Sequence, residues 1–205
     1  MPEASQRREH DQAADCVRNG LPLSDYPRFR RPHPGTAPPA RESSTALIAG
    51  APEHVSGGGV ANSAFCVDEQ GETAAVYRKV QLYGGEESDA FVAGDELLIV
   101  ELCGLKMGLM ICFDVEFPEV ARSLARAGAE LLVTISANME PFGNDHAVFA
   151  SARALENGLP HAYLNQVGPG EKGLTFTGSS AVISQDGEVL AQAGSTEEAI
   201  TSAGL

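Results

Sequence analysis

Leu105-Lys106-Met107-Gly108-Leu109-Met110-Ile111 is followed directly by Cys112-Phe113-Asp114-Val115-Glu116-Phe117-Pro118-Glu119. The first seven residues are largely apolar and have the length of a buried strand, and proline at position 118 is favoured in the first turn of a helix. A buried strand that leads into a helix is typical of α/β proteins. We therefore expect the thiol of Cys112 to lie at the end of a buried strand, a position suited to a nucleophile.

Further strands and helices are predicted on either side of this stretch. From Thr45 onward, short apolar runs are bounded by glycine or polar turns, which predicts strands at residues 46–49, 64–67, 74–77, 97–102, 131–135, 161–165, 181–184 and 188–191. Helices are expected at residues 118–126 and 146–157, and Gly158 is a stop signal for the second. The fold class is therefore α/β.

The first 41 residues differ from the rest of the chain. They contain seven arginines against five acidic residues, hold seven of the twelve prolines, and show almost no periodic apolar pattern. Such a segment cannot bury enough apolar surface to order itself, so we predict an atypical, disordered segment at residues 1–41. A basic arm for nucleic acid and a disrupted reading frame are the alternatives. We expect one domain at residues 42–205.

Composition excludes several classes of function. The formal net charge of −14 disfavours a nucleic-acid partner, because phosphate binding needs clustered lysine and arginine. The four cysteines show no Cys-x-x-Cys spacing, which argues against zinc and thioredoxin-like sites and fits a reducing compartment. No apolar stretch approaches the roughly 20 residues of a membrane span. A soluble cytoplasmic protein without metal or cofactor is the expectation.

Three residue types in the chain suit covalent hydrolysis of an amide. Such a reaction needs a strong nucleophile, a stabiliser for the oxyanion and a proton shuttle. Cys112 is the candidate nucleophile, Lys79 ends a predicted strand, and Glu86 and Glu87 follow in the next loop. The structural alternatives are a small buried cysteine and a solvated lysine at a sheet edge.

Tyr77-Arg78-Lys79 and Cys112-Phe113-Asp114 resemble motifs of the carbon-nitrogen hydrolase (nitrilase) superfamily, over about residues 41–199. The resemblance implies a four-layer αββα sandwich, here lacking the family's opening strand-helix-strand unit. An aromatic residue followed by Asp after the nucleophile resembles the amidase branch. It implies hydrolysis of a small amide. Loss of the opening unit would leave an unpaired strand edge and exposed apolar surface, so we expect residues 42–205 to self-associate as a homo-oligomer or to aggregate.

The same resemblance assigns roles to individual residues. Cys112 would attack the amide, Lys79 and the amide nitrogen of Phe113 would hold the oxyanion, and Glu87 would orient the lysine and contact substrate, with Glu86 not excluded. The family's general base is a Glu after Pro, and the only counterpart is Glu3. The loop with Asn138 and Met139 corresponds to the family's acyl pocket, and a structural ion pair is expected between Arg153 and Glu156.

Three other hypotheses stay open. Asp114, Glu116 and Glu119 could form an acidic metal site, although no histidine lies near them in sequence. Cys112 and His146 could form a Cys-His protease pair. The competing hypothesis from a different class is a truncated, non-catalytic homologue of an amidase, which serves at most for association.

Overall fold

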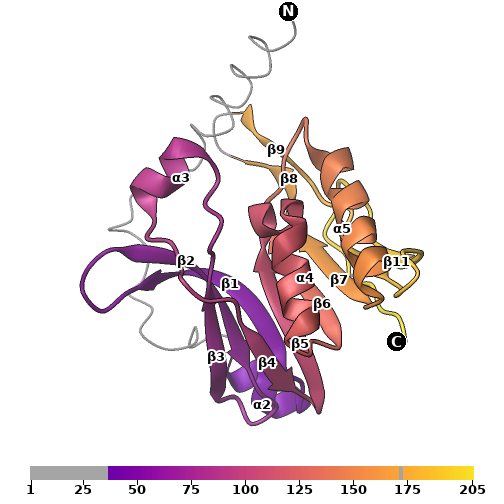
Figure 1. Cartoon of the computed structure of the whole chain (residues 1–205), viewed down its shortest axis with the longest axis horizontal. Helices are drawn as coiled ribbons and strands as arrows, with labels where there is room; N and C mark the ends of the chain where they lie inside the picture. The colour runs from indigo at the N-terminus through magenta and orange to yellow at the C-terminus, as the bar shows by residue number, and fades with distance from the viewer. Residues whose placement is uncertain (1–36, 171–172) are drawn as a thin grey trace, which may run out of the picture.

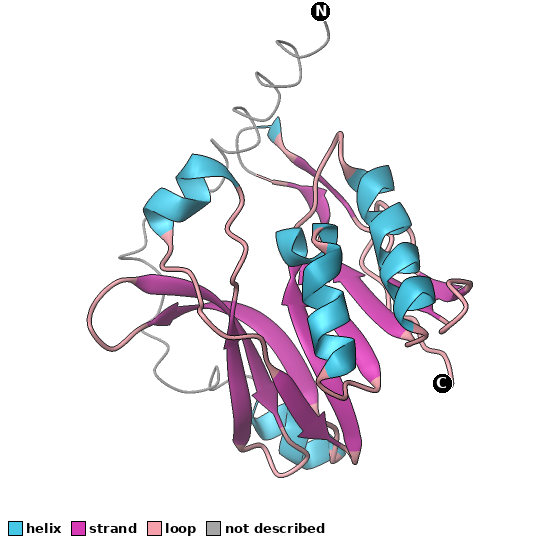
Figure 2. Ribbon diagram, viewed as in Figure 1, coloured by secondary structure: helices cyan, strands magenta, loops and turns pink. Residues whose placement is uncertain are grey.

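The computed structural model describes residues 37–170 and 173–205, and in it two β-sheets face each other (Figures 1 and 2). The smaller sheet is antiparallel and holds β1 (Leu47–His54), β2 (Val60–Val67) and β3 (Thr73–Arg78) in that order. The larger sheet has the order β11-β10-β7-β6-β5-β4. Its strands are β4 (Ile99–Leu102), β5 (Leu105–Ile111), β6 (Leu131–Ser136), β7 (His161–Asn165), β10 (Ala181–Ile183) and β11 (Val189–Gln192).

The three central strands of the larger sheet, β5, β6 and β7, are parallel, and the outer ones pair antiparallel. Two helices pack with this sheet, α4 (Pro118–Arg126) and α5 (Gly143–Asn157). Shorter elements complete the described chain: α2 (Ala37–Ser43), α3 (Gly84–Ala90), the 3₁₀ turn η1 (Cys112–Glu116), and the small hairpin β8 (Val167–Pro169) and β9 (Thr175–Thr177).

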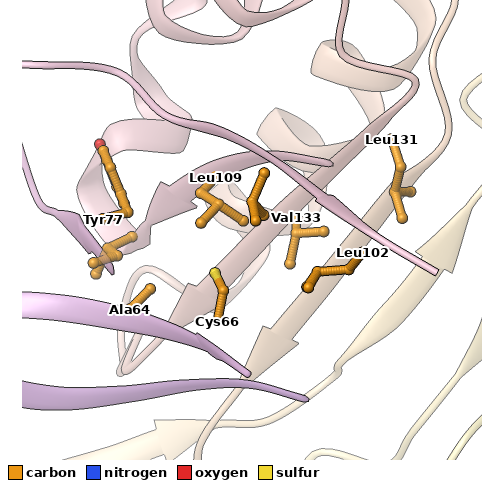
Figure 3. Close-up of a cluster of buried hydrophobic side chains, with 9 residues drawn as sticks. Ala64, Cys66, Tyr77, Leu102, Leu109, Leu131 and Val133 are labelled. Atoms are coloured by element: carbon orange, nitrogen blue, oxygen red, sulfur yellow. The ribbon is translucent and has the colours of Figure 1, made fainter. Parts of the chain in front are cut away.

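Alternation along β5 explains why this strand is buried on both faces. Successive side chains of a strand point to opposite sides. Leu109 and Ile111 face the smaller sheet, where they pack in a cluster with Cys66 and Tyr77 (Figure 3). Met110 belongs instead to the cluster beneath α4, whose buried side chains include Val120, Ala121 and Leu124. The near-continuous apolar run of residues 105–111 is thus the sequence of a central strand between two layers.

A glycine in β5 allows α4 to approach the sheet closely. A Cβ atom at Gly108 would lie 3.0 Å from Cβ of Leu124 and 3.1 Å from Cβ of Ala129. Any larger residue there would push the helix away from the strand that ends at Cys112. The close packing of α4 against the strand that ends at Cys112 therefore requires glycine at position 108.

Most predicted elements are present, with differences at the edges. The strands of the first hairpin are longer than predicted, and α3, β8 and β9 were not predicted. The predicted boundary at residue 41 falls inside α2, where Ala40 is fully buried and Arg41 Nε donates to the carbonyl of Gln70 at 2.8 Å. Residues 1–36 lie outside the described chain. The described residues contain no strand-helix-strand unit ahead of β1, and none of their helices is long and apolar enough to cross a membrane.

Candidate active site

Cys112 and two other polar residues gather at the carboxyl ends of the parallel strands. Cys112 directly follows β5, Ser136 ends β6 and Asn165 ends β7. Open sheets with parallel strands bind their ligands at this edge, because the loops that follow the strands meet there. Lys79 comes to the same region from the smaller sheet, immediately after β3.

Cys112 has a backbone conformation that is rare for its type. Its φ of 46° lies in the left-handed region, at the first residue of η1. A residue with a Cβ pays about 1–2 kcal/mol there. The side chain is partly buried and packs beside the cluster between the sheets. Strain of this kind turns the chain sharply from β5 into η1, so that the thiol is presented at the end of the strand.

Lys79 and Glu87 form a deeply buried ion pair. The lysine Nζ lies 2.7 Å from Oε2 and 3.0 Å from Oε1 of Glu87, and the two residues are 2% and 3% exposed. Asn62 Nδ2 donates to Oε1 at 2.9 Å, and the backbone N–H of Tyr83 donates to Oε2. Both carboxylate oxygens are therefore satisfied, and Lys79 is not the solvated edge lysine of the alternative.

Asp114 joins three segments through one buried carboxylate. Its Oδ2 accepts from the Tyr77 hydroxyl and from the Ile111 N–H, both at 2.8 Å, and its Oδ1 accepts from the Gln81 N–H at 2.9 Å. Burial raises the pKa of Asp114, and these three donors together with nearby Lys79 oppose that rise. No three metal-ligating side chains gather anywhere in the described residues, so the carboxylates of the 112–119 stretch do not form the metal site considered above.

His146 is not placed as the partner of the thiol. Its Nδ1 lies 2.8 Å from the hydroxyl of Tyr163, and its Nε2 lies 3.3 Å from Oε1 of Glu116. Burial raises the pKa of Tyr163, so the phenol is neutral. Because both ring nitrogens of His146 have other partners, the Cys-His pair of the protease hypothesis is not formed.

Arg153 fixes the end of η1 from α5. Its Nε donates to the carbonyl of Val115 at 2.9 Å and its Nη2 to the carbonyl of Glu116 at 3.0 Å. Its Nη1 lies 3.0 Å from Oε1 of Glu156, which is the expected ion pair. The two carbonyl contacts were not predicted from sequence, because they join residues 37 and 38 positions apart.

The residues expected to shape the acyl pocket lie in the loop after β6. The Asn138 N–H donates to Oδ1 of Asn165 at 2.7 Å, and its side-chain amide donates to the carbonyl of Phe142 at 3.0 Å. Met139 makes an isolated β-bridge with Phe176. Asn165, which the sequence analysis missed, also donates to the carbonyls of Asn138 and Gly178. Its position at the end of a parallel strand is the signal that could have identified it.

Aromatic rings line the turn beside the thiol. Phe113 makes edge contacts with Tyr83 and with Phe117, and both centroid separations are 5.1 Å. The ring of Phe113 thereby connects η1 to the residue just before α3, the helix that carries Glu87. Glu3 lies outside the described residues, and Glu86 precedes Glu87 in α3.

Comparison with known proteins gives one consistent answer. The family model described as carbon-nitrogen hydrolase matches residues 38–205. An (R)-stereoselective amidase from a Pseudomonas species is 40% identical over 157 residues, which is 77% of this chain and 56% of that protein. The chain thus spans little more than half the length of the curated relatives it matches.

Solved structures show the same likeness. The carbon-nitrogen hydrolase from Helicobacter pylori G27 superposes with a TM-score of 0.74 at 33% identity, covering 79% of this chain and 62% of that one. A variant of the amidase from Nesterenkonia sp. AN1, with acrylamide added at its active-site cysteine, gives 0.72 at 37% identity, covering 78% and 63%. The predicted family and the predicted α/β sandwich are confirmed.

Proposed function

The chain belongs to the carbon-nitrogen hydrolase family, and from that premise we propose that it hydrolyses small non-peptide amides to ammonia and a carboxylic acid through an acyl-enzyme on Cys112. The observation that carries the proposal is the buried Lys79–Glu87 pair, whose lysine lies between Tyr77 and Gln81, both bonded to Asp114 beside the cysteine at the end of β5. A cation held without water near a developing oxyanion stabilises it far more than in solution.

The proposed reaction has two steps. In the first, Cys112 Sγ bonds to the amide carbon while Lys79 Nζ and the Phe113 N–H hold the oxyanion. The carbon–nitrogen bond then breaks, and the nitrogen leaves as ammonia with a proton that the base took from the thiol. In the second, the base takes a proton from water as the water attacks the thioester carbon, the carbon–sulfur bond breaks, the acid is released, and the proton returns to the sulfur of Cys112. Glu87 orients the lysine and contacts substrate, and we propose Glu3 as the base.

The acyl group would lie against the loop after β6. Asn138 is held by hydrogen bonds from its backbone N–H and from its side-chain amide, and Met139 forms a β-bridge with Phe176 of β9. These contacts fix the loop at the edge of the sheet where the thiol lies. A fixed wall discriminates acyl groups by shape. We therefore expect short amides to react in preference to N-carbamoyl compounds, and a clear preference for carbamoyl substrates in a panel of both would contradict this substrate class.

Labelling with fluoroacetamide tests the role of the cysteine. In a variant of the Nesterenkonia amidase this compound leaves its acetamide moiety on the active-site cysteine. We expect peptide mass spectrometry to find the acetamide group on Cys112, and ammonia release from short amides to stop in Cys112→Ala. Cys103 is exposed and serves as an internal control for ordinary thiol reactivity. If Cys112 reacts no faster than Cys103 and no amide is hydrolysed, the non-catalytic association module is the better account.

A further inference from the structure

Asp114 is a fully buried charged group to which the proposed reaction gives no step. It is 0% exposed, and each of its three hydrogen bonds is 2.8–2.9 Å long. Burying a carboxylate without compensation is costly, and partners of this kind offset the cost. Because the buried carboxylate of Asp114 is stabilised by three hydrogen-bond donors, it also holds those three donors in place around it.

The three donors belong to the segments that carry the two reacting groups. Tyr77 lies two residues before Lys79 and Gln81 lies two residues after it. Ile111 is the residue immediately before Cys112. Because β3 belongs to the smaller sheet and β5 to the larger one, the carboxylate of Asp114 joins the two sheets at the point where the lysine and the cysteine leave them.

Among the hydrogen bonds of the described residues, those of Asp114 join the segment around Lys79 to the strand that ends at Cys112. The other contacts of Lys79 are with Asn62, Glu87 and Gly94, none of which lies in the larger sheet. The contacts of Arg153 hold the far end of η1, away from the lysine. Asp114 therefore contributes to the relative position of the two reacting groups, together with the ring contact between Phe113 and Tyr83.

We propose that Asp114 is a positioning residue that sets the distance and orientation of Lys79 relative to Cys112. The inference rests on the proposed function only in taking these two residues as the reacting pair. Asp114 acts through Lys79 and does not contact the substrate. An asparagine at this position offers one acceptor oxygen, and its amide group would face a backbone N–H, so one of the three segments would be released.

The test is the alkylation rate of Cys112 by iodoacetamide at neutral pH, measured on its own peptide by mass spectrometry. A nearby cation favours the reactive thiolate. We expect Asp114→Asn to slow alkylation about tenfold, the scale of coupling between groups in one network. The sign is informative, because loss of a negative charge near the thiol would by itself speed the reaction. A faster or unchanged rate in Asp114→Asn would overturn the proposal.

A double-mutant cycle shows whether Asp114 works through the lysine. In a Lys79→Met background, adding Asp114→Asn should no longer slow alkylation, since the coupling partner is gone and only the loss of the negative charge remains. An equal slowing in both backgrounds would assign the effect to general loosening and overturn the proposal. Tyr77→Phe removes a single donor, so it keeps the test open if Asp114→Asn does not fold, and it should slow alkylation to a smaller extent.

Two controls separate this inference from the proposed function. Asp68→Asn neutralises a carboxylate that accepts two backbone N–H bonds in the turn between β2 and β3, at the opposite end of β3 from Lys79, and should leave the rate unchanged. Amide turnover is measured separately on the parent chain. A parent that hydrolyses no amide but shows the Asp114 effect on alkylation would refute the proposed function and leave the positioning role intact.

Discussion

At the scale of the residue, we expect the Lys79–Glu87 pair to affect both the stability of the fold and the hydrolysis of amides. Both charges are buried and fully compensated, so removing one leaves the other without its counter-charge. Losing one partner of a buried pair costs about 3–5 kcal/mol. We expect Lys79→Met to lower the free energy of unfolding in urea by about 3 kcal/mol and to abolish amide hydrolysis.

The double variant Lys79→Met with Glu87→Gln checks this account. Neutralising the stranded carboxylate should restore part of the lost stability, because no uncompensated charge is then buried. Activity should stay absent, because the cation is still missing. If Lys79→Met unfolds at the same urea concentration as the parent, the pair contributes nothing and the burial argument is wrong.

His161 supplies a pH dependence of stability far from the thiol. It is fully buried, with Nε2 2.8 Å from the Thr134 hydroxyl and Nδ1 3.0 Å from the carbonyl of Ala150. Burial lowers the pKa of His161 from 6.5 to about 4. In the unfolded chain the imidazole takes up a proton near pH 6.5, whereas in the folded chain it does so only near pH 4. Folding is therefore favoured by this residue above pH 6.5, and that stability is lost as the pH falls towards 4.

The expected loss from His161 is about 3 kcal/mol between pH 7 and pH 4, since each unit of pKa corresponds to about 1.4 kcal/mol. Denaturant unfolding across this range measures it. The variant His161→Gln keeps a polar side chain that does not titrate, so its unfolding free energy should vary with pH less steeply than that of the parent. Parallel curves for the two proteins would show that another group causes the acid sensitivity.

At the scale of the element, η1 is held from both ends. At its start, the carboxylate of Asp114 accepts a hydrogen bond from the N–H of Ile111. At its end, the guanidinium of Arg153 donates hydrogen bonds to the carbonyls of Val115 and Glu116. Unpaired buried carbonyls cost about 1–3 kcal/mol each. We expect Arg153→Met to lower the unfolding free energy by about 2–4 kcal/mol. Glu156→Ala removes only the partly exposed ion pair and should cost less than about 1 kcal/mol. Equal effects would show that the ion pair, and not the carbonyl contacts, is what matters.

Which elements the sequence predicts depends on whether local signals agree with the packing. The helix α4 has its predicted bounds because Pro118 marks its first turn and an apolar stripe follows. The start of α5 lies three residues before the predicted one, since Gly143-Asn144-Asp145 shows no helical pattern. The helix α3 begins with two glycines, poor helix formers, and it is anchored by the contacts of Glu87 with Lys79 and Asn62.

The candidate site likewise contains residues that the sequence predicted and contacts that it did not. Cys112, Lys79 and Glu87 were predicted because they lie in short motifs next to strand ends. The contacts of Asp114 and the carbonyl contacts of Arg153 were not, because each joins segments more than 30 positions apart and depends on how the two sheets and α5 pack. Single-residue chemistry was thus visible in the sequence, whereas the network that orients it is a property of the tertiary structure.

At the scale of the whole molecule, α5 and β11 expose more apolar surface than their surroundings require. Val148 and Leu155 lie seven residues apart on one side of α5 and are 58% and 62% exposed, and Val189 and Leu190 on β11 are about half exposed. A Cβ atom at Gly187, in the turn before β11, would lie 3.1 Å from Leu155, so the helix and the strand share one surface. Val189 pairs with Ile183, whose side chain packs against α5, so we call the side chains of Val148, Leu155 and Val189 the α5–β11 surface. Apolar patches of this kind are typical of interfaces.

We therefore expect the chain to form homo-oligomers through the α5–β11 surface. Burying two aliphatic side chains contributes roughly 3 kcal/mol, so Val148→Asp with Leu155→Asp should weaken association more than about a hundredfold. Light scattering over a range of protein concentrations measures this. Because the chain already carries a net charge of −14, added aspartates also increase repulsion between copies.

The control Val92→Asp with Leu97→Asp adds the same two charges at exposed apolar positions away from α5 and β11, so it should leave association nearly unchanged. A parent that scatters as a monomer at every concentration, or a control that dissociates as readily as the α5 variant, would show that this surface joins no second copy.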